Sequence, residues 1–256
     1  LTFLWCPGEG TPLNEIKKLN PGEALWVKRG NIEKKITWYK LPIFNKKIVN
    51  FSKRQAINGV KDHLRKAVHR QMISDVPVGA FLSGGLDSSS VVCFAKEIDE
   101  TIPCFTIDTK NTDPGMTDDL PYAKKTADFL GVPLEIVSVD PLQMASDLEK
   151  MVIQLDEPLA DLAPLNVMYI SQLAKKNGIK VLLSGAGGDD LFTGYRRHTA
   201  VRLDEYFDLL PTSLLNVIEK ATSKLNLNVG PFRKLSKLFN GVTLESDDRL
   251  INYFLW

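Results

Sequence analysis

The sequence has few cysteines and no long apolar run. Cys6, Cys93 and Cys104 are odd in number and show no C-x-x-C spacing, which argues against both a disulfide framework and a zinc site. No run of about 18 apolar residues and no cleavable signal pattern occurs, so a cytoplasmic protein without a membrane partner is the default expectation. Cys93 lies in an apolar helical segment, where we expect a small core residue.

An excess of either charge is also lacking. The 256 residues contain 32 Lys+Arg and 31 Asp+Glu, a formal net charge of +1. Bulk attraction to nucleic acid or to an acidic membrane surface is therefore not expected. With 44% apolar and 25% charged residues, the composition is typical of a globular protein. The length allows one large domain, or one domain and part of another.

A third absence concerns the stretch VGAFLSGGLDSSS, from Val78 to Ser90. A Walker A loop requires a lysine after its glycines, and none follows here, so the γ-phosphate transfer of that class is not indicated. The apolar run at 78–82 is too short for a helix, and helical apolar spacing begins after the glycine pair. This pattern predicts a buried strand, a tight loop and a helix.

The loop carries groups that suit a phosphate or pyrophosphate. Backbone N–H groups, a helix dipole and hydroxyls attract the anion, and glycines let the backbone approach it. Asp87 would repel a phosphate unless a divalent cation bridged them, which indicates Mg²⁺. The alternative is a plain turn with Ser and Asp as helix caps. The residues of the expected anion site are Ser83, Gly84, Gly85, Ser88 and Ser89.

Along the chain, residues 1–45 predict short β segments separated by turns, as in the tail of a β-rich domain. A second domain is expected over residues 46–256. Strands expected at 103–107, 134–139 and 179–183 alternate with helices, which favours a doubly wound, mainly parallel α/β sheet. Amphipathic helices are expected from Asp204 onward.

A second glycine-rich segment, SGAGGDDLF, begins at Ser184 after the last expected strand. The dinucleotide fingerprint G-x-G-x-x-G would need glycine at Asp190, so it does not apply. Loops at the carboxyl ends of neighbouring strands converge on one crevice in open α/β sheets. We therefore expect Asp87 and Asp189 to hold Mg²⁺ against bound phosphates. For Asp190, a role as a helix cap or dipole partner is an equal alternative.

The first loop resembles the pyrophosphate-binding loop of ATP-pyrophosphatases, and most closely that of glutamine-dependent asparagine synthetases. Members of that family also carry S-G-[DE]-G-[GS]-D-[DE]-x-F-x-G-Y. The chain matches it at Ser184, Gly185, Gly187, Gly188, Asp189, Asp190, Phe192, Gly194 and Tyr195. The phrases D-E-P-x-A-D at 156–161 and L-x-P-G-x-x-L at 19–25 extend the resemblance over nearly the whole chain.

The resemblance implies an adenine nucleotide alpha-hydrolase-like ATP-pyrophosphatase fold with C-terminal helices, truncated at its C-terminus. It implies ATP and Mg²⁺ as cofactors and amidation of a carboxylate through an acyl-adenylate, with release of AMP and pyrophosphate. The nucleotide contacts that it implies are Leu82, Ile107, Ser184 and Gly185. The catalytic residues that it implies are Asp87, Asp189, Asp190 and Tyr195.

Partners follow from the same resemblance. They are ATP, an acceptor such as aspartate, and ammonia released from glutamine by a glutaminase domain of which this chain has only the tail. Cys6 is expected to be structural rather than the nucleophile of that domain. A homodimer is compatible with the resemblance, and no nucleic acid is expected.

Two departures from the family pattern keep the acceptor open. Ala186 stands where the family usually has an acid that handles the acceptor or the amine, and Ala163 stands where serine is common. Three interpretations remain: conversion of aspartate to asparagine, amidation of another acid such as a sugar uronate or peptide carboxylate, or a catalytically silent nucleotide-binding scaffold.

Overall fold

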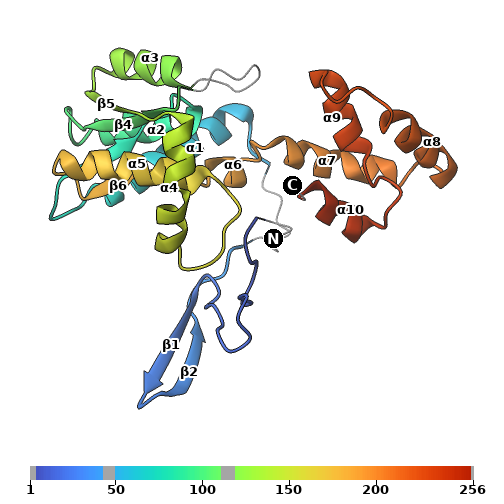
Figure 1. Ribbon diagram of the computed structural model, residues 1–256, viewed down its shortest axis with the longest axis horizontal. Coiled ribbons are helices and arrows are strands. Elements are labelled where there is room, and N and C mark those ends of the chain that lie inside the picture. Colours follow the sequence, from blue (N-terminus) through green and yellow to red (C-terminus); the bar gives the residue numbers. More distant parts are fainter. Residues whose placement is uncertain (1–3, 43–49, 111–118, 255–256) are drawn as a thin grey trace. The chain divides into compact units, whose positions relative to one another are not determined.

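The computed structural model describes residues 4–42, 50–110 and 119–254, with the side chains of Arg196 and Glu205 excepted (Figure 1). Apart from the first four residues, the chain forms two compact units, unit 1 (Trp5–Gly185) and unit 2 (Ala186–Trp256). No helix in the described ranges is long and apolar enough to cross a membrane.

Unit 1 contains a four-stranded parallel sheet with the strand order β5-β4-β3-β6. Its strands are β3 (Val78–Phe81), β4 (Cys104–Asp108), β5 (Leu134–Ser138) and β6 (Val181–Leu183). The chain proceeds outward from β3 through β4 to β5 and then returns to the other side of β3. The direction of winding therefore changes between β3 and β6, which is where ligands bind in sheets of this kind.

Helices cover both faces of the sheet (Figure 1). One face has α1 (Lys53–Gln71), α2 (Leu86–Ala95) and α3 (Leu120–Leu130), and the other has α4 (Pro141–Gln154) and α5 (Ala163–Lys176). Successive strand residues point to opposite faces, so β4 contributes Cys104 to the first core and Phe105 to the second. The predicted doubly wound α/β fold is confirmed.

Local sequence signals set several helix ends. Ser52 accepts a hydrogen bond from the Gln55 N–H, and the Gln55 side chain accepts one from the Ser52 N–H, which forms a capping box at the start of α1. The Asp140 side chain accepts from the Gln143 N–H at the start of α4. α3 ends at Gly131, whose φ of 64° suits glycine.

The expectation for Cys93 was wrong, because its side chain is exposed. Val91, Val92 and Ala95 turn the inner face of α2 toward the core, and Cys93 falls on the opposite side of the same helix. Cys104 is fully buried instead, and burial raises the pKa of its thiol to about 12.

The N-terminal part of unit 1 forms an antiparallel hairpin of β1 (Glu23–Lys28) and β2 (Asn31–Thr37). Arg29 and Gly30 both have positive φ, as a tight two-residue hairpin turn requires. Lys35 of β2 forms an ion pair of 2.9 Å with Glu23 across the hairpin and another of 2.9 Å with Glu9 of the preceding segment. Short β segments are therefore present in this part of the chain, as expected, and their assignment to the tail of a separate domain stays a prediction.

Unit 2 is helical, as predicted for the C-terminal residues. Its helices are α6 (Gly188–Leu191), α7 (Arg196–Phe207), α8 (Thr212–Thr222), α9 (Gly230–Phe239) and α10 (Ser246–Tyr253). Phe207, Leu215 and Val242 form its core.

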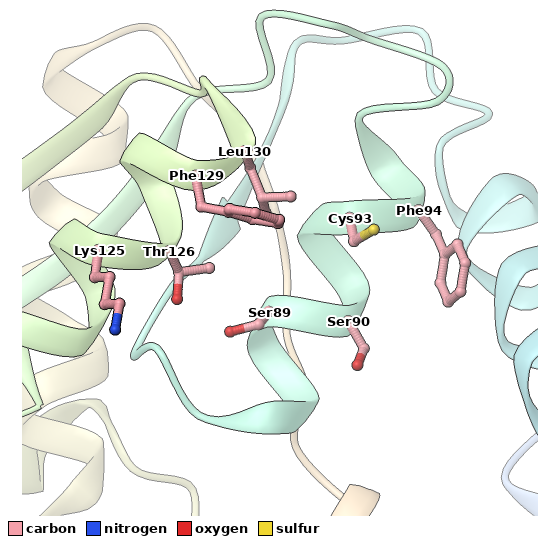
Figure 2. A pocket seen from close by; sticks show the side chains of 8 residues that line it. All are labelled: Ser89, Ser90, Cys93, Phe94, Lys125, Thr126, Phe129 and Leu130. Carbon is pink, nitrogen blue, oxygen red and sulfur yellow. The ribbon is translucent and has the colours of Figure 1, made fainter.

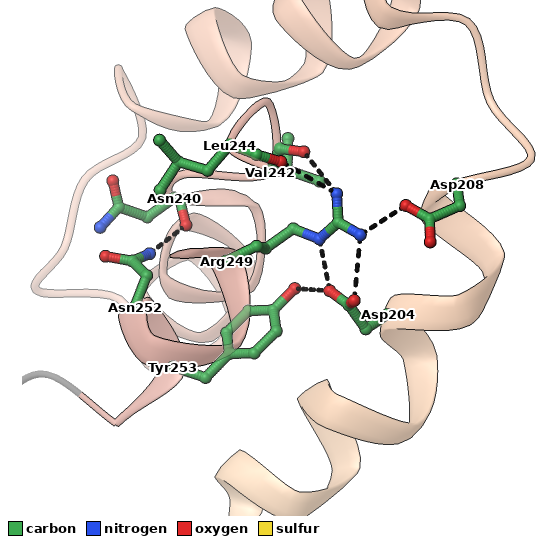
Figure 3. Close-up of polar contacts among 8 residues, drawn as sticks. All are labelled: Asp204, Asp208, Asn240, Val242, Leu244, Arg249, Asn252 and Tyr253. Carbon is green, nitrogen blue, oxygen red and sulfur yellow. Dashed lines mark hydrogen bonds and ion pairs between the residues drawn. The ribbon is translucent and has the colours of Figure 1, made fainter. Parts of the chain in front are cut away.

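A buried arginine ties α10 to α7 within this unit (Figure 3). Arg249 is 3% exposed, and its Nε and Nη2 donate to the two carboxylate oxygens of Asp204 at 2.5 and 3.0 Å. Its Nη2 also donates to Asp208 at 2.6 Å, and Tyr253 Oη donates to Asp204 at 3.0 Å. The Nη1 group donates to the carbonyls of Val242 and Leu244. The guanidinium is therefore surrounded by acceptors, as a buried charge requires.

Candidate functional site

The first glycine-rich loop follows β3 at the carboxyl edge of the sheet. Gly84 has φ of 77°, and a Cβ there would overlap the backbone of Tyr122 and Ala123. Only glycine therefore fits where the loop passes the beginning of α3. Gly85 is the N-cap of α2, so the amino end of that helix begins at the loop.

Two serine hydroxyls lie inside this loop. The Oγ atoms of Ser83 and Ser88 are 3.0 Å apart, and Ser88 Oγ accepts from the Ser83 N–H at 3.3 Å. Ser83 Oγ accepts from the Gly85 N–H at 3.3 Å, and Ser88 Oγ donates to the Gly85 carbonyl at 3.2 Å. These bonds hold the loop in a compact form. Ser89 lies elsewhere, on the side of α2 that faces α3 (Figure 2).

The second glycine-rich loop follows β6, the parallel neighbour of β3. A Cβ on Gly185 would lie 2.7 Å from Ser88 N, 2.9 Å from the Asp87 carbonyl carbon and 3.0 Å from Asp87 Cβ. The beginning of the second loop is therefore in close contact with the first turn of α2, and only a residue without a side chain allows it. Up to Gly185, the two predicted loops meet at the point where the winding changes.

Leu82 and Ile107 stand at the carboxyl ends of β3 and β4. Leu82 is 1% exposed, and its N–H donates to the Phe105 carbonyl at 2.9 Å. The side chain of Ile107 packs on the face covered by α4 and α5. Both backbones thus lie at the edge that carries the loops, and their contacts with a nucleotide stay predictions, as does that of Ser184.

Asp189, Asp190 and Tyr195 belong to unit 2, where both acids lie in the first turn of α6. Gly194 N–H donates to the Asp189 carbonyl at 2.9 Å, and a Cβ on Gly194 would overlap the Asp189 carboxylate. The guanidinium of Arg197 lies 4.2 Å from the centroid of the Tyr195 ring and 3.9 Å from Asp190 Oδ1. The pairing of Asp87 with Asp189 at a metal stays a prediction.

The chemical types of the groups around Asp87 suit a magnesium ion. The loop offers one carboxylate and hydroxyl oxygens, the hard ligands that Mg²⁺ prefers. In the described parts of the chain, no three His, Cys, Asp or Glu side chains gather as a metal cluster. Magnesium commonly takes one or two protein carboxylates and completes its octahedron with water and substrate phosphates, so Asp87 suits this pattern.

An ion pair that involves the D-E-P-x-A-D phrase was not predictable from the sequence, because its partner lies 139 residues away along the chain. Lys18 Nζ lies 2.9 and 3.2 Å from the carboxylate oxygens of Glu157, and it also donates to the Cys6 carbonyl. Lys18 further lies over the Trp5 ring, 5.5 Å from its centroid. The loop that holds Glu157 precedes α5, which leads the chain back to the amino edge of β6. The ion pair therefore connects the loop before α5 with the N-terminal segment of unit 1.

The doubly wound parallel sheet places this chain among the open α/β proteins. In proteins of this class, ligands bind at the switch point, where the two glycine-rich loops lie. The family model described as asparagine synthase matches residues 59–250, and the chain belongs to this family. The resemblance found in the two loops is thereby confirmed.

The curated relatives to which this chain is similar include proteins named asparagine synthetase and proteins named amidase. The chain is 32% identical over 219 residues to the glutamine-hydrolysing asparagine synthetase 1 of Bacillus subtilis, which covers 85% of this chain and 33% of that protein. A putative asparagine synthetase 2 of Methanocaldococcus jannaschii is 34% identical over 178 residues, with 70% and 34% covered. The amidase chyE of Penicillium rubens is 33% identical over 168 residues, with 60% and 25% covered. The chain spans about a quarter to a third of the length of these relatives.

Proposed function

We propose that this chain carries out the ATP-dependent amidation of a carboxylate. The acceptor carboxylate attacks the α-phosphate of ATP, which gives an acyl-adenylate and releases pyrophosphate; ammonia then attacks the acyl carbon and AMP leaves. The contact of Gly185 with Asp87 and Ser88, in a member of the asparagine synthase family, is the observation that carries this proposal. The relatives named asparagine synthetase support aspartate as the acceptor and glutamine as the source of ammonia.

In this proposal the first loop binds the phosphates. Its N–H groups, the amino end of α2 and the serine hydroxyls are fixed before the reaction, so they stabilise charge on the phosphates in the transition state without reorganisation. Asp87 holds Mg²⁺, which supplies positive charge to the same phosphates. The residues assigned to the nucleotide are Leu82, Ser83, Gly84, Gly85, Ser88, Ser89, Ile107, Ser184 and Gly185, and those assigned to the reacting groups are Asp87, Asp189, Asp190 and Tyr195.

A second candidate is amidation of an acid other than aspartate. Ala186 places a methyl group where the family pattern leads us to expect a carboxylate. A carboxylate can act as a general base, which typically contributes about 10²–10⁴-fold to a rate. A relative named amidase is 33% identical over 60% of this chain, which supports an acceptor other than aspartate. Ala186→Asp is expected to raise asparagine formation if the second candidate holds.

Pyrophosphate exchange decides among the candidates. The chain is incubated with ATP, Mg²⁺, labelled pyrophosphate and one acid at a time from a panel of aspartate, glutamate, uronates and peptide carboxylates. We expect label to enter ATP with aspartate, and asparagine to form when ammonia is added. Exchange with another acid but not with aspartate would select the second candidate. ATP binding without exchange for any acid would select the silent scaffold.

A further inference from the structure

A groove of about 410 Å³ lies between α2 and α3 in unit 1 (Figure 2). It shares one residue, Ser89, with the residues assigned to the nucleotide, and its other lining residues are outside that set. Its lining consists of Ser89, Ser90, Cys93 and Phe94 from α2 and Lys125, Thr126, Phe129 and Leu130 from α3.

Both walls of the groove are held in place by the core beneath them. Ala123 and Ala127 of α3 are 0% and 3% exposed and pack in the same core as Val91 and Val92 of α2. Lys96, just after α2, donates to the carbonyl of Leu130 at the end of α3. The groove is thus formed without an occupant, and a ligand would not have to open it.

Its lining divides into a polar and an apolar part. In Figure 2 the Lys125 ammonium and the hydroxyls of Thr126 and Ser89 lie on one side, and the side chains of Phe129 and Leu130 lie on the other. Phe129 is 87% exposed, so a large ring stands in water. Among the eight lining residues, Lys125 is the charged one.

We propose that this groove binds a small amphipathic anion, a carboxylate or phosphate with an apolar body. Lys125 and the hydroxyls hold the anionic head through charge-assisted hydrogen bonds, and the apolar body packs on Phe129 and Leu130. The volume lies within the range of about 300–1,000 Å³ that is usual for small-molecule sites, with the usual mixture of apolar walls and few polar groups. The site goes beyond the proposed function and does not depend on it.

Cys93 provides a direct reporter, because it is exposed and lines the groove. The rate of its alkylation by iodoacetamide is followed peptide by peptide in a mass spectrometer, with Cys6 as the internal control outside the groove. Octanoate, octyl phosphate, octanol and inorganic phosphate are the probes. Octanoate or octyl phosphate should slow labelling of Cys93 with a saturable dose response and leave Cys6 unchanged. Octanol should need a concentration about tenfold higher, since it lacks the charge.

Matched variants on α3 test the role of the charge. Lys125→Met should weaken protection by octanoate and octyl phosphate about tenfold. Lys124→Met, an exposed neighbour outside the groove, should leave it unchanged. Phe129→Ala should weaken every probe that has an apolar chain, and thermal melts check that each variant folds. A preference for one head group would tell a carboxylate ligand from a phosphate one.

Any of four results would overturn the proposal. Octanol and octanoate could protect Cys93 equally, or the probes could protect Cys6 as much as Cys93. Lys125→Met could leave the protection of Cys93 unchanged, or neither anion could protect Cys93 at all. Because the measurement is thiol labelling rather than catalysis, its outcome is independent of pyrophosphate exchange. Failure of the proposed function and failure of this site are therefore distinguishable.

Discussion

At the scale of single residues, Gly185 is the position where the second loop packs against the first turn of α2 so closely that a single added Cβ would clash. Gly185→Ala would place a Cβ 2.7 Å from Ser88 N, against backbone that cannot move as a flexible side chain would. We expect a loss of stability of about 1–3 kcal/mol, as for overpacked sites, and strongly weakened ATP binding. Denaturant unfolding and calorimetric titration with ATP measure the two effects.

Gly59→Ala is the matched control. Gly59 lies within α1, and apart from its chain neighbours and the backbone of its own helix, no described atom lies within 4 Å of the added Cβ. Alanine should therefore stabilise the helix by about 0.5–1 kcal/mol and leave ATP binding unchanged. If Gly185→Ala behaved in the same way, the close contact between the loops would not matter for the site.

The metal assignment is tested at Asp87. Asp87→Ala removes the carboxylate in the first turn of α2 and should abolish the Mg²⁺ dependence of ATP binding, as measured by calorimetric titration with and without the metal. Asp128→Ala, an exposed acid on α3, is the control and should leave that dependence intact. An unchanged Mg²⁺ dependence in Asp87→Ala would refute the assignment.

At the scale of helices, Tyr169 joins α5 to α4. Tyr169 Oη donates to Asp147 Oδ2 at 2.8 Å, and burial together with this hydrogen bond raises the pKa of Tyr169 to about 12. An unfolded tyrosine loses its proton near pH 10, so above that pH the folded state binds more protons than the unfolded state. The stabilising contribution is present below about pH 10 and is lost as the pH rises toward about 12.

We therefore expect the free energy of unfolding to fall between about pH 10 and 12, and less steeply in Tyr169→Phe. Tyr122→Phe, at a ring that is 60% exposed, should follow the parent protein. Tyr253 contributes to the fall in the free energy of unfolding in the parent protein and in both variants, because burial and its hydrogen bond to Asp204 also raise the pKa of Tyr253. Urea unfolding across this pH range gives the comparison; identical slopes for Tyr169→Phe and the parent would contradict it.

Arg249 is the corresponding tie between α7 and α10 (Figure 3). Arg249→Met would leave the buried carboxylate of Asp204 without its cation, which costs roughly 3–5 kcal/mol in comparable buried pairs. Hydrogen exchange of α7 and α10 should rise sharply in this variant, while exchange in the parallel sheet of unit 1 stays slow. Arg202→Met, an exposed change on α7, should have little effect. Unaltered exchange in Arg249→Met would show that the ion pair does not hold these helices.

At the scale of the whole molecule, the hairpin of β1 and β2 exposes unusually large apolar side chains. Trp26 and Ile32 in its strands are each 64% exposed, and Trp38, directly after β2, is 70% exposed. A two-stranded hairpin is marginally stable without further packing. We expect this polypeptide to self-associate as its concentration rises, and Trp26→Lys with Trp38→Lys to reduce the effect. Sedimentation velocity measures it. Ile73→Lys is the control, because Ile73 is 84% exposed and lies outside the hairpin. Equal self-association of the parent protein and all variants would contradict a role for the hairpin.

Most of the fold follows from short-range signals in the sequence. The apolar run at Val78, the glycines that follow it and the capping box at Ser52 each act within a few residues, so they specify strands, loops and helix starts directly. Cys93 shows the limit of such signals. Its neighbours in α2 are apolar on several sides of the helix, so the sequence pattern does not show which side faces the core.

The sequence alone determined the alternation of strands and helices, the two glycine-rich loops and the family to which the chain belongs. Tertiary structure decided that β6 pairs with β3, that Gly185 touches Ser88 and that Lys18 pairs with Glu157 across 139 residues of sequence. It also placed Lys125 beside Ser89 in one groove. The physical reason is the range of the interactions: propensity, capping and turn chemistry act between neighbours in the chain, whereas these contacts form only when distant segments are packed into the same sheet and core.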